Sequence, residues 1–166
     1  MIGSSAAWAA GYTGAGSRIA IIDTGADVDH PSLDPDALKY ALQGSNATIM
    51  TEADLTDEVL NQLNAYTRKA GLTAADFYVN EKIPFGFNYV DADTDITHDN
   101  DTQGDHGSHV TGIAAGNRFV KDEAGNYVAA LDSVMTQGVA PDAQILTMKV
   151  FGKGGGAYDS DYMVAI

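Results

Sequence analysis

The sequence predicts an α/β fold with a mostly parallel sheet, and three observations support this. Two apolar runs rich in β-branched residues, 19–22 and 144–151, have the length and composition of buried strands. Segments with helical character begin near residues 51 and 106, between these two strands. Strands that alternate with helices in this way favour βαβ units, in which the strands run parallel.

Composition limits the classes of function. With 166 residues, of which 45% are hydrophobic, the chain is long enough for one domain with a substantial core. Its formal net charge of −14 argues against nucleic-acid binding, because that function needs clustered Lys and Arg. The absence of cysteine excludes disulfides and thiol catalysis. We see neither an apolar run long enough for a membrane span nor a signal peptide in these residues.

A short helix and a strand open the chain. Residues 4–10 begin with serine and continue with good helix formers, which predicts a helix anchored in the core by Trp8. Residues 19–22 have no polar face, as expected for a strand buried on both sides. Asp23 follows at the carboxyl end of this strand, where ligands bind in open parallel sheets. Taken alone, Asp23 is equally well interpreted as a chemical group or as a cap of the following turn.

Residues 44–80 differ in character: the part from residue 51 to 71 predicts one amphipathic helix, and residues 73–76 predict another brief turn. Thr51 and Asp54 resemble a capping box, and apolar residues follow at helical spacing up to Gly71. No chemically useful residues cluster here, so we interpret this segment as a surface insertion whose apolar stripe packs on the main body. Residues 84–90 alternate aromatic and small side chains and predict a further strand.

An acidic loop follows, with a carboxylate at every second position in Asp91, Asp93 and Asp95. Calcium prefers several carboxylate oxygens as ligands. The match to an EF-hand is poor, because Ile96 stands where glycine is required and Thr102 where a bidentate Glu is required. A solvated loop is therefore favoured over a calcium site, and these carboxylates are weak candidates for metal ligands.

Residues 106–116 predict a helix rich in small residues, which lets its backbone lie close to a sheet at the expense of helix propensity. His106 stands at the start of this helix, and His109 follows one turn later on nearly the same face.

Three chemical interpretations compete at this point. In the first, Asp23 orients His106 as a general base for a serine supplied elsewhere. In the second, His106 and His109 bind zinc with Asp23 or Asp105, although the Glu of an H-E-x-x-H signature is missing. The third is a non-catalytic α/β domain.

The last third of the chain predicts an irregular segment, a strand and a helix. Residues 119–135 contain turn residues and are interpreted as a second insertion. Residues 152–158 form a glycine-rich turn that lacks the order of a phosphate-binding loop. Asp159 or Ser160 is expected to cap a final helix, which reaches the end of the sequence without a stop signal. We therefore expect the chain to be cut within this element.

Three motifs in this order resemble the subtilisin-like serine proteases, the subtilase or peptidase S8 family. Residues 21–25, Ile-Ile-Asp-Thr-Gly, are similar to the aspartate motif of the family. Residues 106–112, His-Gly-Ser-His-Val-Thr-Gly, are similar to its histidine motif. Residues 138–141 and 148–152 are similar to the turn and strand that follow the histidine helix. The two insertions look more like those of the large cell-envelope proteinases than the compact secreted enzymes.

The resemblance implies a three-layer subtilisin-like fold with a mostly parallel sheet, of which residues 1–166 would be the N-terminal part. It implies that Asp23 is the orienting acid, that His106 is the general base and that His109 is a buried structural histidine. It also implies that the stretch after the second strand binds an extended peptide as an added strand. The residues concerned are Gly154, Gly155, Gly156 and Ala157, with Tyr158 at the border of a side-chain pocket.

Two parts of the family machinery are absent from the sequence. The nucleophile of the family lies in a downstream Gly-Thr-Ser motif, and its oxyanion-hole Asn also comes later than the final helix. Ser108 is no substitute, because it lies inside the histidine helix. We expect a serine endopeptidase with an Asp-His-Ser triad, of which this chain alone carries two members and is inactive. The alternative is a degenerate or calcium-binding structural module.

The resemblance also implies partners and location. Polypeptides are the expected substrates, and the remainder of the catalytic domain is the expected partner. No cofactor is required, and calcium stays open as a ligand, although residues 119–135 replace the loop that holds a tight calcium site in compact members. The implied location is extracellular or in the cell envelope.

Overall fold

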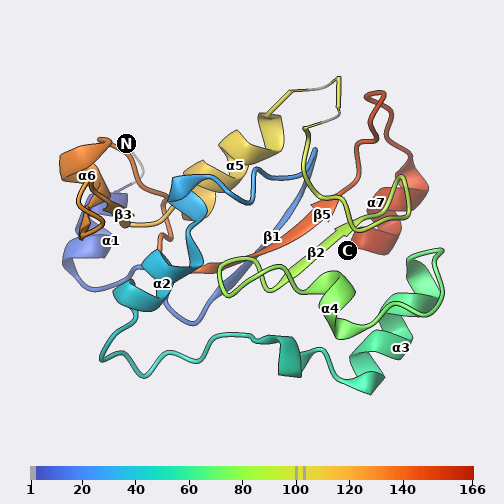
Figure 1. Cartoon of the computed structure of the whole chain (residues 1–166), viewed down its shortest axis with the longest axis horizontal. Helices are drawn as coiled ribbons and strands as arrows, with labels where there is room; N and C mark the ends of the chain where they lie inside the picture. The colour runs from blue at the N-terminus through green and yellow to red at the C-terminus, as the bar shows by residue number, and fades with distance from the viewer. Residues whose placement is uncertain (1–2, 100, 103) are drawn as a thin grey trace.

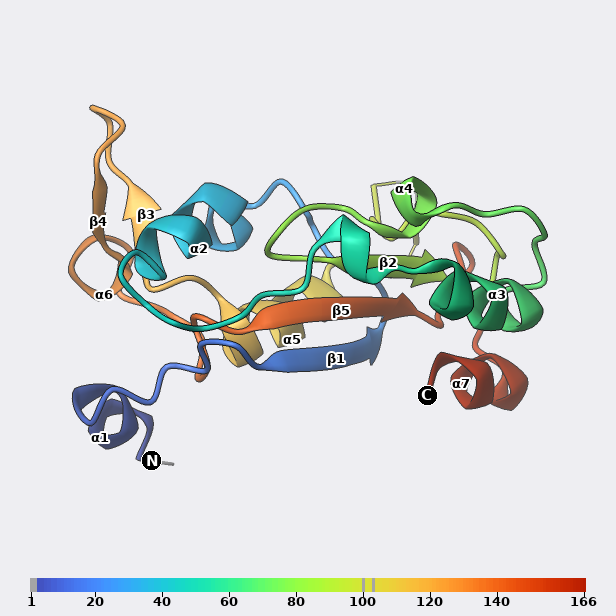
Figure 2. The ribbon, with the colours of Figure 1, turned by 90° about the horizontal axis from the view of Figure 1, so that it is seen from below.

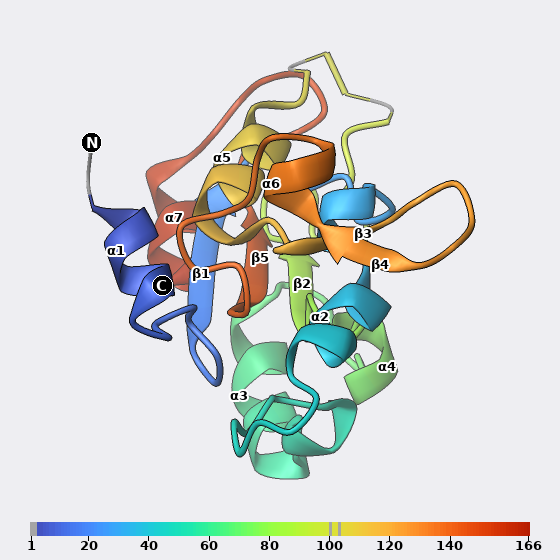
Figure 3. The ribbon, with the colours of Figure 1, turned by 90° about the vertical axis from the view of Figure 1, so that its left-hand side faces the viewer.

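The computed structural model describes residues 3–99, 101–102 and 104–166. Its centre is a parallel sheet in the order β1-β5-β2, in which all three arrowheads point to the same end (Figure 2). The strands are β1 (Arg18–Asp23), β2 (Phe85–Asn88) and β5 (Gln144–Lys149). Helix α5 (His106–Ala115) covers one face, and α3 (Asp57–Tyr66) and α4 (Ala74–Phe77) cover the other (Figures 1 and 3). The predicted α/β fold with a parallel sheet is confirmed.

Shorter elements surround this centre. The segment 119–135, predicted to be irregular, instead contains an antiparallel hairpin and one turn of helix. Within the described residues, no helix has the length and apolar character needed to cross a membrane. The remaining elements are α1 (Ser4–Ala9), η1 (Pro31–Leu33), α2 (Pro35–Ala41), η2 (Glu52–Asp54), β3 (Phe119–Lys121), β4 (Tyr127–Ala129), α6 (Ala130–Ser133) and α7 (Asp159–Ala165).

The middle strand β5 separates two hydrophobic clusters. Because side chains alternate along a strand, Ile145 lies in the cluster beneath α5, whereas Met148 lies in the cluster beneath α3. The second cluster includes Phe85 and Phe87 of β2. Both faces of β5 are therefore covered.

Strand β1 does not have the two-sided burial that its apolar sequence predicts. Only Ile21 is buried, Ile22 is half-buried and Ala20 is exposed. The reason is its place in the sheet: among the described residues β1 pairs only with β5, so its other edge has no neighbouring strand.

Residues 44–80 pack on the sheet as predicted, but not as one helix. The capping box of Thr51 and Asp54 is present, yet it closes the short 3-10 turn η2. Helix α3 begins afresh after Thr56, whose hydroxyl accepts a hydrogen bond from the backbone N–H of Val59. Two consecutive caps therefore divide the predicted helix.

Two predictions about the first and last helices are wrong. Helix α1 has no buried residue, and Trp8 is half-buried, with its indole N–H donating to the carbonyl of Val139 at 2.9 Å. Helix α7 begins at Asp159 and follows an extended Tyr158, so neither Asp159 nor Ser160 is its cap.

Helix α5 approaches the end of β1 so closely that only glycine fits between them. A Cβ atom on Gly107 would lie 2.1 Å from the carbonyl oxygen of Gly25. Gly25 has a φ of +109° and is itself confined, since a Cβ atom there would lie 2.3 Å from the carbonyl oxygen of Ile96. The small residues of the predicted helix are thus explained at this position by contact between backbones.

We predict opposite effects for two glycine substitutions within α5. Gly107→Ala should lower the free energy of unfolding by about 2 kcal/mol or more, because a backbone atom must move. Gly112→Ala should leave it unchanged or raise it by about 0.5–1 kcal/mol, because no atom lies within 4 Å and alanine favours the helix. Urea unfolding measures both values, and equal effects would contradict the close contact.

Lys82 is fully buried between the sheet and the turn that precedes β5. Its ammonium donates to the carbonyl oxygens of Pro141 at 2.9 Å and Ala143 at 2.8 Å. Burial lowers the pKa of Lys82 from its ordinary value of 10.5 to about 7, although the Asp142 charge opposes the shift.

This shift predicts a pH-dependent stability. Between about pH 7 and 10.5 the unfolded chain binds more protons at Lys82 than the folded chain does, so stability should rise with pH in this window. The slope reaches at most about 1.4 kcal/mol per pH unit. When Lys82→Met is unfolded with urea at several pH values, its free energy of unfolding should lack this slope.

Lys39→Met is the matched control. The pKa of Lys39 is raised by its hydrogen bonds to Asp36 and Glu81, so the stability that it contributes is lost only above 10.5. The difference between the wild-type chain and Lys39→Met should therefore stay constant across the same window. A similar slope for both variants would contradict the assignment to Lys82.

Candidate active site

Two side chains that are far apart in the sequence meet at the carboxyl end of the sheet. Asp23 is the last residue of β1, and His106 is the first residue of α5. His106 Nδ1 lies 2.8 Å from Asp23 Oδ1. The structure therefore brings together the acid and the histidine that the sequence singled out.

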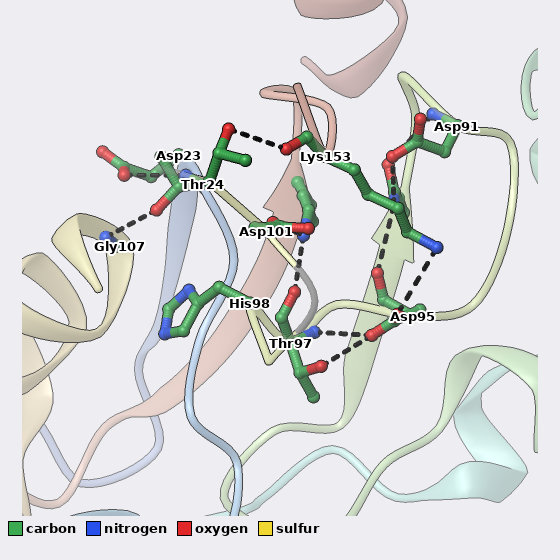
Figure 4. Close-up of polar contacts among 12 residues, drawn as sticks. Asp23, Thr24, Asp91, Asp95, Thr97, His98, Asp101, Gly107 and Lys153 are labelled. Atoms are coloured by element: carbon green, nitrogen blue, oxygen red, sulfur yellow. Dashed lines mark hydrogen bonds and ion pairs between the residues drawn. The ribbon is translucent and has the colours of Figure 1, made fainter. Parts of the chain in front are cut away.

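Thr24 connects the two elements that carry this pair. Its backbone N–H donates to Asp23 Oδ1 at 2.7 Å, and its hydroxyl oxygen accepts from the N–H of Gly107 at 2.8 Å (Figure 4). The N-cap residue of α5, Asp105, forms no side-chain cap of its own. Thr24 thus satisfies one of the free N–H groups at the start of α5 while its backbone holds the carboxylate.

The surroundings of the pair make the imidazole of His106 a stronger base. The Asp23 side chain is 15% exposed and that of His106 is 69% exposed. The hydrogen bond that His106 donates to Asp23, together with the negative charge of Asp23, raises the pKa of His106 above the ordinary 6.5. With Nδ1 directed at the carboxylate, Nε2 is the ring nitrogen that can exchange a proton with a further group.

Ser108 is engaged in other contacts. Its hydroxyl oxygen accepts from the backbone N–H of Asp27 at 2.7 Å and lies 2.8 Å from His98 Nε2. These bonds connect α5 to the loops on either side of it. Both contacts give Ser108 a structural place in the helix, and no pattern in the sequence pointed to His98 as its partner.

The burial predicted for His109 is wrong. Its side chain is 72% exposed, and Nε2 lies 3.5 Å from the carboxylate of Asp105, one turn earlier. The reason is that the face of α5 which carries His109 points away from the sheet in the described chain. The exposed Ile113 marks the same face.

The acidic loop satisfies its carboxylates with neighbouring groups. Asp91 accepts from the Asn88 amide and Asp93 from the N–H of Asp95. Asp95 accepts from the N–H and hydroxyl of Thr97 (Figure 4). The bond from the Thr97 hydroxyl is the main reason why the pKa of Asp95 is lowered. The loop therefore uses one oxygen of each of these carboxylates for its own turns, and calcium binding stays a prediction.

No metal-binding cluster is formed by the described part of the chain, in which no three His, Asp or Glu side chains gather around a point. The zinc interpretation needed His106 and His109 together with Asp23 or Asp105. In the structure these histidines pair separately with different carboxylates.

A buried ion pair beside Asp23 was missed from the sequence. Lys149, which is opposite Asp23 in the register of β1 and β5, is fully buried. Its ammonium contacts the carboxylate of Asp101, also buried, and the carbonyl oxygen of Thr97. The pair fastens the loop that leads to His106. The sequence feature that could have indicated this pair is Lys149, a charged residue at the end of a largely apolar strand.

The predicted substrate-binding stretch lies at the same edge of the sheet. The N–H of Gly152 donates to the carbonyl of Gly156 at 2.8 Å, which closes a tight turn. Thr102 donates to the carbonyl of Lys153 from its backbone at 3.0 Å and from its hydroxyl at 3.1 Å. The candidate residues all face solvent, and they are Gly154, Gly155, Gly156, Ala157 and Tyr158.

Known proteins are similar to this chain over most of its length. A sequence model of the subtilase family matches residues 14–166. The chain is 35% identical over 144 residues to the PII-type proteinase of Lactococcus lactis subsp. cremoris. The aligned region covers 84% of this chain and 6% of that protein. It is 30% identical over 159 residues to the minor extracellular protease Vpr of Bacillus subtilis. This aligned region covers 93% of this chain and 12% of that protein.

A third relative is bacillopeptidase F of Bacillus subtilis, 30% identical over 159 residues, or 96% of this chain and 8% of that protein. The chain thus spans a small part of the length of the curated relatives that it matches. The match of the family model, the similarity to these proteases and the parallel sheet with paired Asp23 and His106 lead to one conclusion: the chain belongs to the subtilase family of serine peptidases.

Proposed function

We propose that the chain provides the acid and the base of a serine endopeptidase whose nucleophile lies outside these 166 residues. The observation that carries this proposal is the 2.8 Å contact between His106 Nδ1 and Asp23 Oδ1. The relatives named as proteases support it. Without a nucleophile and an oxyanion hole, the chain by itself is inactive.

In this mechanism His106 accepts a proton through Nε2 from the serine hydroxyl, which attacks the peptide carbonyl. Asp23 keeps the Nδ1–H tautomer and stabilises the imidazolium that forms. His106 then returns the proton to the leaving amine, and water hydrolyses the acyl-enzyme. Thr24 keeps Asp23 and the start of α5 in register during these steps.

The proposal extends to the organisation of the chain. Residues 1–166 are the N-terminal part of a catalytic domain, with insertions at 44–80 and 119–135. The first insertion contributes the layer formed by α3 and α4, and the second forms the β3–β4 hairpin with α6. The substrate is a polypeptide that binds along residues 154–158. The location is extracellular or in the cell envelope, and the name of one relative, the minor extracellular protease Vpr, supports the first of these.

A first prediction concerns the pKa of His106. Asp23→Asn should lower it toward 6.5, since the hydrogen bond and the charge of Asp23 cause the upward shift. Titration of the imidazole C–H signals by NMR measures the change. Asp105→Asn, which removes the carboxylate beside His109, is the control and should leave His106 unaffected. Equal shifts in both variants would refute the proposed pairing.

A second prediction concerns reactivity. The chain alone should not react with a fluorophosphonate probe, whereas the full-length protein should be labelled on serine. In the full-length protein His106→Ala should slow labelling by about a thousandfold or more. His30→Ala, which alters an exposed histidine at η1, should be labelled at the wild-type rate. Labelling of the isolated chain, or full labelling of His106→Ala, would overturn the assigned roles.

A further inference from the structure

Arg68 connects three segments at the carboxyl end of the sheet. It follows α3, and its Nη2 lies 3.0 Å from Oδ1 of Asp161 in the first turn of α7. The same nitrogen donates to the carbonyl oxygen of Tyr89 and, at 3.4 Å, to that of Val90, directly after β2. Figures 1 and 2 show α3 and α7 at this same end of the sheet.

Burial and backbone conformation both indicate that this contact is held in place. The Asp161 side chain is only 3% exposed, so its carboxylate depends on a partner in the protein. Arg68 has a φ of 58°, which is unfavourable for a residue with a side chain and persists only where surrounding contacts impose it. The preceding Thr67 is 1% exposed and contributes to that constraint.

The contact lies at one end of the candidate substrate-binding stretch. Residues 152–158 run from the end of β5 to the start of α7. Gly152 is enclosed at the first end, where a Cβ atom would lie 3.3 Å from the Val90 side chain. At the other end, Asp161 ties the first turn of α7 to Arg68. The stretch thus begins beside the segment that follows β2 and is tied to that segment through Arg68 at its other end.

We propose that Arg68 is a positioning residue that holds residues 152–158 in the shape that binds a substrate peptide. This inference rests on the proposed peptidase function. A backbone that is ordered before binding does not have to be ordered by the substrate, so it binds an added strand more tightly. The segment 44–80 would in this way act on substrate affinity without touching the substrate.

The test compares Arg68→Met with Arg118→Met in the full-length protein. Arg118 is a close match, because its Nε lies 2.9 Å from the buried carboxylate of Asp142 and its Nη2 donates to the carbonyl of Ala41 at 2.8 Å. It lies away from residues 152–158. Both variants remove an arginine from a buried carboxylate, and only one of them affects the candidate stretch.

For Arg68→Met we expect KM for a long peptide to rise about tenfold, with kcat and fluorophosphonate labelling nearly unchanged. Arg118→Met should leave KM unchanged. Arg68→Lys keeps a cation beside Asp161 but lacks the guanidinium fork, so its KM should lie between the values of the wild type and of Arg68→Met. An equal rise of KM in Arg118→Met, or an equal loss of kcat and labelling in Arg68→Met, would overturn the proposal.

Hydrogen exchange of the same proteins separates this inference from the peptidase assignment. Amides of residues 152–158 should exchange about tenfold faster in Arg68→Met than in wild type, and at the wild-type rate in Arg118→Met. This readout does not require catalysis. Unchanged exchange in Arg68→Met would refute the role of Arg68, whereas absence of peptidase activity in every protein would refute the proposed function.

Discussion

The close approach of α5 to the end of β1 is the constraint on which the site depends. Gly107 and Gly25 let the two backbones meet, and Thr24 bonds to both elements at this point. Because the helix start is fixed to the strand end, the position of His106 relative to Asp23 follows from backbone geometry. A side chain at either glycine would separate the elements before it affected any chemical group.

Buried charges organise the surroundings of this contact. Lys149 holds the loop before His106, and Lys82 holds the turn before β5. Each side-chain nitrogen bonds to oxygens that approach from distant parts of the chain, which offsets only part of the cost of removing its charge from water. Such groups add little to the hydrophobic core, but they determine how the loops at the sheet edge are placed.

Much of the fold could be predicted, because it depends on local patterns. The strands, the helix that begins at His106 and the position of Asp23 at a strand end all follow from the spacing of apolar and small residues. Several of the failures concern burial. Residues 19–22 lie in an edge strand, and His109 faces solvent, since burial depends on which elements become neighbours. Trp8 contacts a backbone carbonyl rather than the core for the same reason.

The family, the parallel α/β architecture and the pair of Asp23 and His106 can all be read from the sequence, because short motifs encode strand ends and helix starts. Which charges are buried, and what they contact, depends on the folded arrangement of the chain. Lys149 with Asp101 and Arg68 with Asp161 are the main examples. The physical reason is that an ion pair depends on distance in space, which no spacing along the chain reports.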